Sequence, residues 1–269
     1  MKRNPSVAVL VIVLVVLCVG QPAFGQWLHY RTAGLPRNAK GEPILNAPAP
    51  HLQNGTPDLS GLWGSVQPAK KTTDSSPAFM NLENALVSGS TISMQPSAEA
   101  LYRERRRVES AGRPSERCLP HSIPDAMLIP SVPFKIVQDP GLTLILYEEF
   151  ARFRQVFTDG RPFPEDLNPA WMGSSIGKWE GDTFVVETRG YNDQSWLDDF
   201  GHPHSEALKT TERFHRINIG EMELLITFDD PQSYIKPWTV KLSLRLLPDT
   251  DLIEDVCDNE KDNVHTIKQ

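Results

Sequence analysis

The sequence predicts a mainly β fold, either an antiparallel β-barrel or a β-sandwich, with one short helical insertion. From Pro133 onward, short stretches that are apolar, or that alternate between apolar and polar residues, follow one another at regular spacing. Turn residues separate these stretches and no helical pattern lies between them, which is typical of antiparallel sheets. A parallel sheet would need crossover helices, and this part of the chain has no signal for them.

The N-terminus has the pattern of a secretory signal peptide. Lys2 and Arg3 precede an apolar run at 7–20, and small residues occupy the −3 and −1 positions before Gln26. The run is too short for a comfortable membrane span. We therefore predict cleavage before Gln26 and a periplasmic or secreted protein; retention of the leader as an N-terminal anchor is the alternative.

The charge balance excludes some classes of partner. The chain has 27 Lys and Arg against 34 Asp and Glu, a net charge of −7, and loss of the leader with Lys2 and Arg3 makes it more negative. Nucleic acids and anionic membranes need clustered positive charge. We therefore expect neither as a partner, and after the leader no other stretch is apolar enough to cross a bilayer. The oligomeric state has no sequence signal.

Two cysteines, Cys118 and Cys257, remain after the leader. In an oxidising compartment, two cysteines most simply form one disulfide. A bridge across so long a loop would contribute on the order of 3–5 kcal/mol in the chain-entropy model. The sequence therefore predicts a Cys118–Cys257 disulfide that fastens the C-terminal segment to the middle of the chain.

Beyond the leader at 1–25, we predict two parts. Residues 26–58 are rich in Pro, Asn and Gly without periodicity, which predicts an extended arm. Residues 59–269 form a single β-rich domain, with a loop and helix insertion at about 67–130.

One stretch of this insertion, 97–110, has a helical pattern. Ser97 suits the N-cap and Glu99 the positive end of the helix dipole, while Gly112 and Pro114 end the helix.

The remaining elements are about ten short strands. Turn signals such as "DPG" and Gly181-Asp182 separate them. In "WTVKLSLRLL", Val240 and Leu242 lie on one side and Lys241 on the other, so one face is expected on the core and one in water. The predicted strands lie within 58–66 and at 134–138, 142–149, 152–158, both arms of 176–190, 208–217, 221–230, 238–247 and 252–257.

Several motifs carry a resemblance to known proteins. "GKWEGDTFVVET" at 177–188, "HSEAL" at 204–208 and "KPWTV" at 236–240 resemble a family of uncharacterised exported bacterial proteins. That resemblance implies export and a β-rich domain but no particular activity. Separately, Gly61 and Trp63 in "DLSGLW" resemble the G-x-W signature of lipocalins, which implies a lipocalin-like barrel.

The segment "GHPHSEALKTTERFHR" contains the candidate catalytic residues. Pro203 favours an extended backbone at His202. On an extended strand, His202, His204 and Glu206 would point to the same side at spacings of about 7 Å. Two imidazoles and a carboxylate in this arrangement could catalyse acid–base chemistry or bind a divalent metal.

Asp198 and Asp199 lie just upstream and could join such a site. With them, the histidines would suit a hydrolase- or lyase-like enzyme. The simpler interpretation, which the sequence favours, is an exposed turn with both histidines solvated. We predict no cofactor, with a divalent metal as the alternative.

Trp171 and Trp196 are candidate ligand-binding residues, because both lie in polar, loop-like stretches. An indole in such a loop can line a mouth that receives a small molecule, or it can cap the fold. Arg152, Arg154 and Arg161 are nearby in sequence and could bind a carboxylate.

These observations together predict an exported protein that binds a small or carbohydrate-like molecule in a barrel mouth or sheet groove. The alternative is a periplasmic hydrolase- or lyase-like enzyme that uses His202, His204 and Glu206, with or without a metal.

Overall fold

The computed structural model describes residues 29–66, 81–129 and 132–257. The predicted signal peptide at 1–25 lies outside these residues, as does part of the predicted insertion. In chain order the elements are β1 (Gly61–Val66), η1 (Leu82–Ala85), α2 (Pro96–Arg107), η2 (Pro114–Arg117), η3 (Asp125–Met127), β2 (Phe134–Asp139), β3 (Leu142–Tyr147), η4 (Glu149–Ala151), β4 (Arg152–Phe157), β5 (Ser174–Glu180), β6 (Thr183–Arg189), β7 (Lys209–Arg216), β8 (Glu221–Asp229) and β9 (Trp238–Leu246), where η denotes a 3-10 helix.

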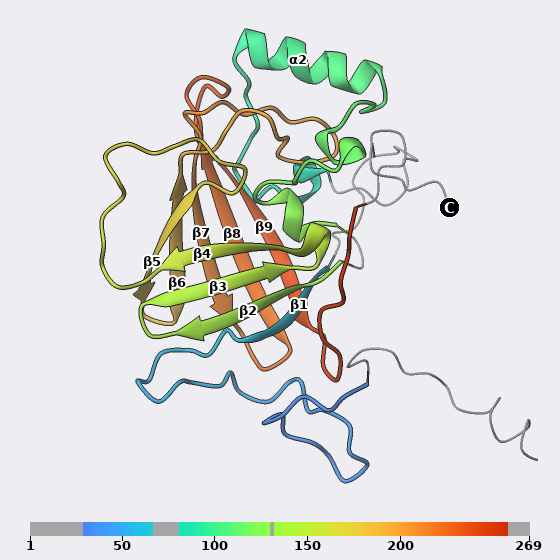
Figure 1. Ribbon diagram of the computed structural model, residues 1–269, viewed down its shortest axis with the longest axis vertical. Coiled ribbons are helices and arrows are strands. Elements are labelled where there is room, and N and C mark those ends of the chain that lie inside the picture. Colours follow the sequence, from blue (N-terminus) through green and yellow to red (C-terminus); the bar gives the residue numbers. More distant parts are fainter. Residues whose placement is uncertain (1–28, 67–80, 130–131, 258–269) are drawn as a thin grey trace, which may run out of the picture.

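Strands β1 to β9 close into one barrel, which confirms the predicted mainly β fold and selects the barrel over the sandwich (Figure 1). Consecutive strands pair around the barrel, and β9 returns to β1, where Trp63 lies opposite Leu246. Because each strand then has a neighbour on both sides, the barrel has no edge strand, although β4 and β5 pair over only two residues each.

One pair of strands departs from the predicted antiparallel arrangement. β4 and β5 run parallel, with Val156 opposite Ser175. Parallel neighbours require the chain to return along the sheet before the next strand begins. Residues 158–173 make this return as a long loop without a helix, so the absence of a helical pattern did not exclude a parallel pair.

The predicted alternation of β9 is confirmed. Trp238, Val240, Leu242 and Leu244 are buried, whereas Lys241 is exposed. The buried side chains of the strands form one apolar core together with residues from η1 and η3, such as Leu82 and Met127. Burial of one face of every strand is the main driving force for the barrel.

A fully buried ion pair interrupts this apolar core. Arg154 of β4 forms a two-pronged salt bridge with Glu212 of β7. The same guanidinium donates to Ser175 Oγ at 2.9 Å and to Thr188 Oγ1 at 2.6 Å. A buried charge needs such partners, because it has lost its hydration. The guanidinium and its partners therefore join four strands, β4, β5, β6 and β7.

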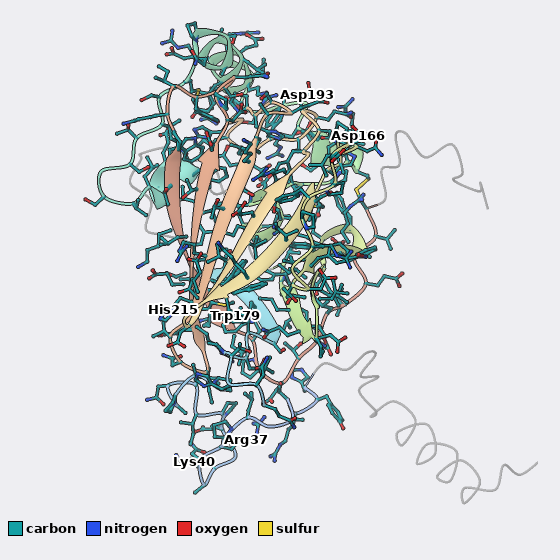
Figure 2. All side chains as sticks on the ribbon, turned by 90° about the vertical axis from the view of Figure 1, so that its left-hand side faces the viewer. Arg37, Lys40, Asp166, Trp179, Asp193 and His215 are labelled. Atoms are coloured by element: carbon teal, nitrogen blue, oxygen red, sulfur yellow. A yellow bond between two sulfur atoms is a disulfide. The ribbon has the colours of Figure 1, made fainter. Side chains whose placement is uncertain are left out.

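Different segments cover the two ends of the barrel (Figure 1). Helix α2 lies beyond one end, which we call the α2 end, and residues 29–58 lie at the other, which we call the arm end. Figure 2 shows Asp193 near the α2 end and Arg37 and Lys40 at the arm end. The arm is held to the β7–β8 turn by backbone hydrogen bonds, such as that from Gly220 N–H to the Leu45 carbonyl at 2.7 Å.

The helix is found almost where the sequence places it, but both ends differ, since it ends at Arg107 rather than at 110. α2 begins at Pro96 and Gln95 is the N-cap residue, so the prediction that Ser97 caps the helix is wrong. Proline favours the first helical position because its missing N–H would be unpaired there in any case. Within the described part of the chain, no helix is long and apolar enough to cross a bilayer.

Cys118 and Cys257 lie at disulfide distance, with their Cα atoms 5.5 Å apart, as predicted. The predicted last strand at 252–257 is wrong, because these residues form no strand. β9 already pairs with β1 and β8, so the closed barrel has no free edge for another strand. The C-terminal segment instead runs outside the barrel, where Ile253 N–H donates to Glu148 Oε2 at 3.0 Å.

Candidate functional site

The loop between β6 and β7 carries the predicted histidine site to the α2 end. The prediction that His202, His204 and Glu206 share one face of a strand is wrong, because residues 201–208 contain no strand. The histidines are 0% and 6% exposed, so the interpretation as solvated side chains is also wrong, whereas Glu206 is exposed. Leu197 N–H donates to the His202 carbonyl, which folds the loop back on itself.

His202 forms a buried ion pair with Asp198. The Nδ1 atom of His202 lies 2.7 Å from Asp198 Oδ2. The Asp198 carboxylate also accepts hydrogen bonds from the backbone N–H groups of Leu82 at 2.9 Å and Phe200 at 3.1 Å. Its negative charge is therefore held by protein groups from η1 and from its own loop.

The other nitrogen of His202 faces Glu83. His202 Nε2 is buried without a hydrogen-bond partner, and it lies 3.8 Å from Glu83 Oε1. The ring stacks on Tyr102 of α2, with centroids 4.5 Å apart. Because 43% of the Glu83 side chain is exposed, Asp198, His202 and Glu83 form a line from the interior to solvent.

This arrangement controls the protonation of His202. Burial by itself would lower the pKa of His202, but Asp198 and Glu83 outweigh burial and raise it to about 9. Burial would raise the pKa of Asp198, but His202 and backbone N–H groups hold it below its usual value. His202 is therefore protonated at neutral pH and can serve as a proton donor.

His204 has a different partner. Its Nε2 atom lies 2.7 Å from Ser195 Oγ, and its Nδ1 atom lies 3.3 Å from the Ser205 carbonyl oxygen. Because a carbonyl only accepts, Nδ1 carries the proton and Nε2 accepts from the hydroxyl. Burial lowers the pKa of His204, which favours this neutral form. Ser195 is only 1% exposed, so a substrate does not reach its hydroxyl in this conformation.

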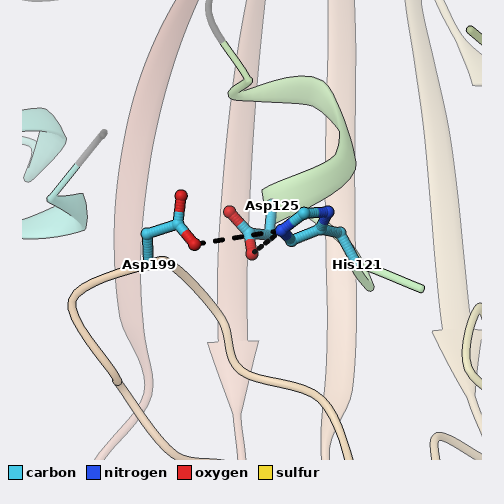
Figure 3. A group of neighbouring side chains, drawn as sticks. All are labelled: His121, Asp125 and Asp199. Carbon is cyan, nitrogen blue, oxygen red and sulfur yellow. Dashed lines mark ion pairs between the residues drawn. The ribbon is translucent and has the colours of Figure 1, made fainter. Parts of the chain in front are cut away.

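Asp199 belongs to a second centre, with His121 and Asp125 (Figure 3). His121 Nε2 lies 3.5 Å from Asp125 Oδ2 and 3.9 Å from Asp199 Oδ1. His121 Nδ1 lies 2.9 Å from Glu149 Oε1. We call these four residues the His121 cluster.

The His121 cluster concentrates buried charge. Burial would lower the pKa of His121, but Asp125, Asp199 and Glu149 outweigh burial and raise it to about 11. The pKa of Asp125 lies well above its usual value, first because it is buried. Within the described residues, His121, Asp125 and Asp199 are the only group of three or more with metal-ligating atoms close enough to share an ion.

The predicted ligand-binding residues do not converge on one pocket. Arg154 is in the buried ion pair with Glu212. Arg161 is exposed and pairs with Asp159, while Arg152 begins β4. Trp196 lies at the α2 end, where the guanidinium of Arg105 stacks on its ring at 4.4 Å. Trp171 is half-buried in the loop that precedes β5.

A cavity of about 700 Å³ lies at the arm end. None of the five predicted ligand-binding residues lines it. The N-terminal arm, the start of β1, β2 and the end of β9 form its walls. Its apolar lining comprises Tyr30, Ala33, Leu35, Pro50, Leu62, Ile219, Leu246 and Leu247.

Charged side chains also line this cavity. Lys135 Nζ lies 2.8 Å from both carboxylate oxygens of Asp251. The Arg216 guanidinium donates to backbone carbonyls, including those of Asp58 and Ile219, and makes no salt bridge with a described carboxylate. Burial lowers the pKa of Arg216 to about 10. Arg31 donates no hydrogen bond within the described residues but interacts electrostatically with Asp249, as Arg216 does with Asp58, which also lines the cavity. The wall therefore carries three basic and two acidic side chains.

Sequence reasoning missed the most important partners of the predicted residues. Glu83, Tyr102, His121, Asp125 and Glu149 lie far from 198–206 in sequence. The "HSIPDA" segment contains a histidine and an aspartate four residues apart, which was a weak signal. Only the tertiary fold brings these segments beside the β6–β7 loop.

No protein-family model matches the chain, and no curated protein matches it.

Proposed function

We propose that the protein binds a small, mainly apolar molecule carrying one acidic group in the arm-end cavity. The cavity itself carries this proposal, since about 700 Å³ lies within the range of small-molecule sites. Its apolar lining would remove the body of such a ligand from water, which is the main source of affinity.

The acidic group of the ligand is inferred from the charges of the lining. Arg216 is buried and satisfied only by neutral carbonyls, and Arg31 has no hydrogen-bond acceptor among the described residues. Asp251 is already paired with Lys135. The lining holds three basic side chains against two acidic ones, Asp58 and Asp251, so a ligand anion near Arg31 and Arg216 would meet a small excess of positive charge.

The same lining favours an apolar ligand over a carbohydrate. Tyr30 is the one aromatic residue among the described residues that line the cavity. Trp171 and Trp196, the indoles predicted to receive a ligand, do not line it.

Two naphthalene dyes test the proposal on the purified chain. Anilinonaphthalene sulfonate is apolar with one anionic group, and N-phenylnaphthylamine is its neutral counterpart. We expect both dyes to bind with one site per chain, and Ala33→Trp, which fills the cavity from the arm, to abolish binding of both. Unchanged dye binding in this variant would refute the cavity as the site.

Arg31→Gln tests the charge. We expect Arg31→Gln to weaken binding of the anionic dye roughly threefold to fivefold, because a single exposed charge contributes little to affinity. Binding of the neutral dye should not change. Arg161→Gln is the matched control, because Arg161 is exposed and lies outside the cavity. Equal weakening of both dyes would argue against recognition of an acidic group.

A second candidate function is acid–base catalysis at the α2 end. It is favoured by the line of Asp198, His202 and Glu83, in which a protonated imidazole lies between two carboxylates and the outer one meets solvent. Such a relay can deliver a proton to a substrate at the Glu83 edge. This differs from the predicted use of His204 and Glu206.

A panel of chromogenic esters, glycosides and phosphate esters tests this candidate. Turnover should be lost in His202→Gln and kept in His215→Gln, because His215 is exposed on β7. Turnover that survives in His202→Gln, or no turnover of any substrate, would count against catalysis at this site.

We also propose that the protein is exported and belongs to the family with the "GKWEGDTFVVET" motif, with a lipocalin-like barrel. The support is the pattern of the leader, the Cys118–Cys257 pair, and the motif's place in the β5–β6 hairpin. Gly61 and Trp63 lie in β1, where the Arg216 guanidinium stacks on the indole at 4.9 Å. Mass spectrometry of the secreted chain should give an N-terminus at Gln26; a retained leader would argue against cleavage.

A further inference from the structure

We propose that His121, Asp125 and Asp199 bind one divalent metal ion of the first transition row, such as Zn²⁺ or Mn²⁺. Their ligating atoms all lie within 4.8 Å of one another, at the α2 end (Figure 3). The ligands come from the segment before β2 and from the β6–β7 loop. The ion would therefore join two loops that are distant in sequence, independently of the arm-end cavity.

The orientation of His121 supports a metal ligand. Its Nδ1 atom contacts Glu149 Oε1 at 2.9 Å, so Nε2 is directed toward the two aspartates. Metal-binding histidines generally donate their other N–H to a carboxylate in this way, which fixes the ring and the tautomer. Nε2 of His121 is buried and has no hydrogen-bond partner.

The spacing also suits an ion. Two ligands about 2.1 Å from a tetrahedral zinc are roughly 3.4 Å apart. The separation of 3.5 Å between His121 Nε2 and Asp125 Oδ2 is close to this value, and the 3.9 Å to Asp199 Oδ1 needs only a small adjustment. These residues line a small cavity of about 10 Å³, which is the volume of one water-sized sphere.

The charge balance gives an independent argument. Asp125, Asp199 and Glu149 bring three carboxylates into a buried region, where Arg113 lies 3.4 Å from Asp199. The Arg113 guanidinium is shared with Glu116, so with neutral His121 the three carboxylates have an excess of negative charge that a dication would reduce. Another buried atom, Glu149 Oε2, has no hydrogen-bond partner, although buried polar atoms normally have one.

The chemical types of the three ligands indicate which metal ions the site would prefer. One imidazole with two carboxylates suits zinc, manganese or iron, whereas calcium and magnesium prefer sites made of oxygen atoms alone. The remaining coordination positions would be filled by water.

Titration calorimetry on the full chain, after dialysis against a chelator, tests the proposal. We expect one saturable site per chain for ZnCl₂ or MnCl₂, and much weaker binding of MgCl₂. Asp125→Asn, which keeps the shape of the side chain, should weaken metal binding at least 100-fold. Glu149 only orients His121, so Glu149→Gln should weaken metal binding about 10- to 100-fold. Asp159→Asn is the control with unchanged affinity, because Asp159 is exposed and pairs with Arg161.

Thermal unfolding supplies a second readout that does not depend on any activity. Saturating metal should raise Tm of the wild-type chain and of Asp159→Asn, because an ion that binds only the folded state stabilises it. Tm of Asp125→Asn should not respond. Dye binding at the arm end should be the same in all three proteins, so failure of the metal proposal is distinguishable from failure of the cavity proposal.

The proposal is overturned if the wild-type chain shows no saturable binding of zinc or manganese, since the cluster is then an ion pair only. It is also overturned if Asp125→Asn and Glu149→Gln bind metal as tightly as the wild-type chain, or if magnesium binds as tightly as zinc.

Discussion

His121, His202 and His204 are all largely buried at the α2 end, yet each has a different protonation state. His121 and His202 face carboxylates, which raise their pKa values to about 11 and about 9. His204 faces Ser195 and a backbone carbonyl, and burial lowers its pKa. The partner, rather than burial alone, therefore decides the charge of each imidazole.

The pair of His202 and Asp198 predicts a loss of stability at alkaline pH. The pKa of His202 rises from 6.5 to about 9 on folding, so its contribution is complete below pH 6.5 and is lost as the pH rises to about 9. His121, whose pKa is also raised, contributes over the same window, so the share of His202 is the difference in the fall between the wild-type chain and His202→Gln, expected to be up to about 3 kcal/mol in urea unfolding. The fall should be smaller in His202→Gln and unchanged in His215→Gln; parallel curves for His202→Gln and the wild-type chain would contradict the assignment.

The buried ion pair of Arg154 and Glu212 predicts that removing one of its charges strongly lowers the stability of the barrel. Glu212→Gln removes the charge that neutralises Arg154, whose side chain is 1% exposed. We expect a loss of about 3–5 kcal/mol in the free energy of unfolding, because the guanidinium cannot regain water. Asp159→Asn breaks the exposed pair with Arg161 and should have a far smaller effect, because solvent screens this pair. Equal effects would show that solvent reaches Arg154.

At the level of elements, the strands follow closely from the sequence pattern. The alternation of β9 and the turns at "DPG" and Gly181-Asp182 are found as predicted. Local patterns decide these elements because side chains alternate along a strand whatever its partners are. Local patterns do not show which strands pair with each other. For this reason, the sequence predicted neither the parallel contact of β4 with β5 nor the absence of a strand at 252–257.

The β5–β6 hairpin also predicts a packing constraint. A Cβ atom on Gly177 would lie 2.6 Å from the Phe184 ring and 2.9 Å from Val156. Gly177→Ala should therefore cost about 1–3 kcal/mol through overpacking. Gly64→Ala in β1 is the matched control, because its Cβ would lie 3.3 Å from the flexible end of Leu247. Urea unfolding compares the two, and a neutral Gly177→Ala would mean that the Phe184 ring moves aside.

At the scale of the whole molecule, the two ends of the barrel differ in character. The α2 end gathers buried histidines and carboxylates from segments that are far apart in sequence. The arm end has a cavity with mainly apolar walls and three basic side chains. The barrel between them is packed, so the proposed ligand and metal sites can be tested separately.

The Cys118–Cys257 pair predicts that the free energy of unfolding depends on whether the two cysteines are oxidised to a disulfide. The pair fastens the C-terminal segment to the loop that leads to the His121 cluster. Replacing both cysteines by serine should cost about 2–5 kcal/mol in the free energy of unfolding. Reductant should lower the stability of the wild-type chain and leave the double variant unchanged. A response of the double variant to reductant would contradict this origin of the effect.

The sequence by itself determined the mainly β fold, most strand positions, the helix and the cysteine pair, because these depend on local periodicity and on residue type. Tertiary structure alone decided that the histidines are buried, that Asp198 and Asp199 serve different imidazoles, and that Glu83, His121, Asp125 and Glu149 join them. It also formed the arm-end cavity from segments at both ends of the chain. The physical reason is that charge pairing and cavities depend on which segments meet in space, and a closed barrel brings together residues that no local pattern connects.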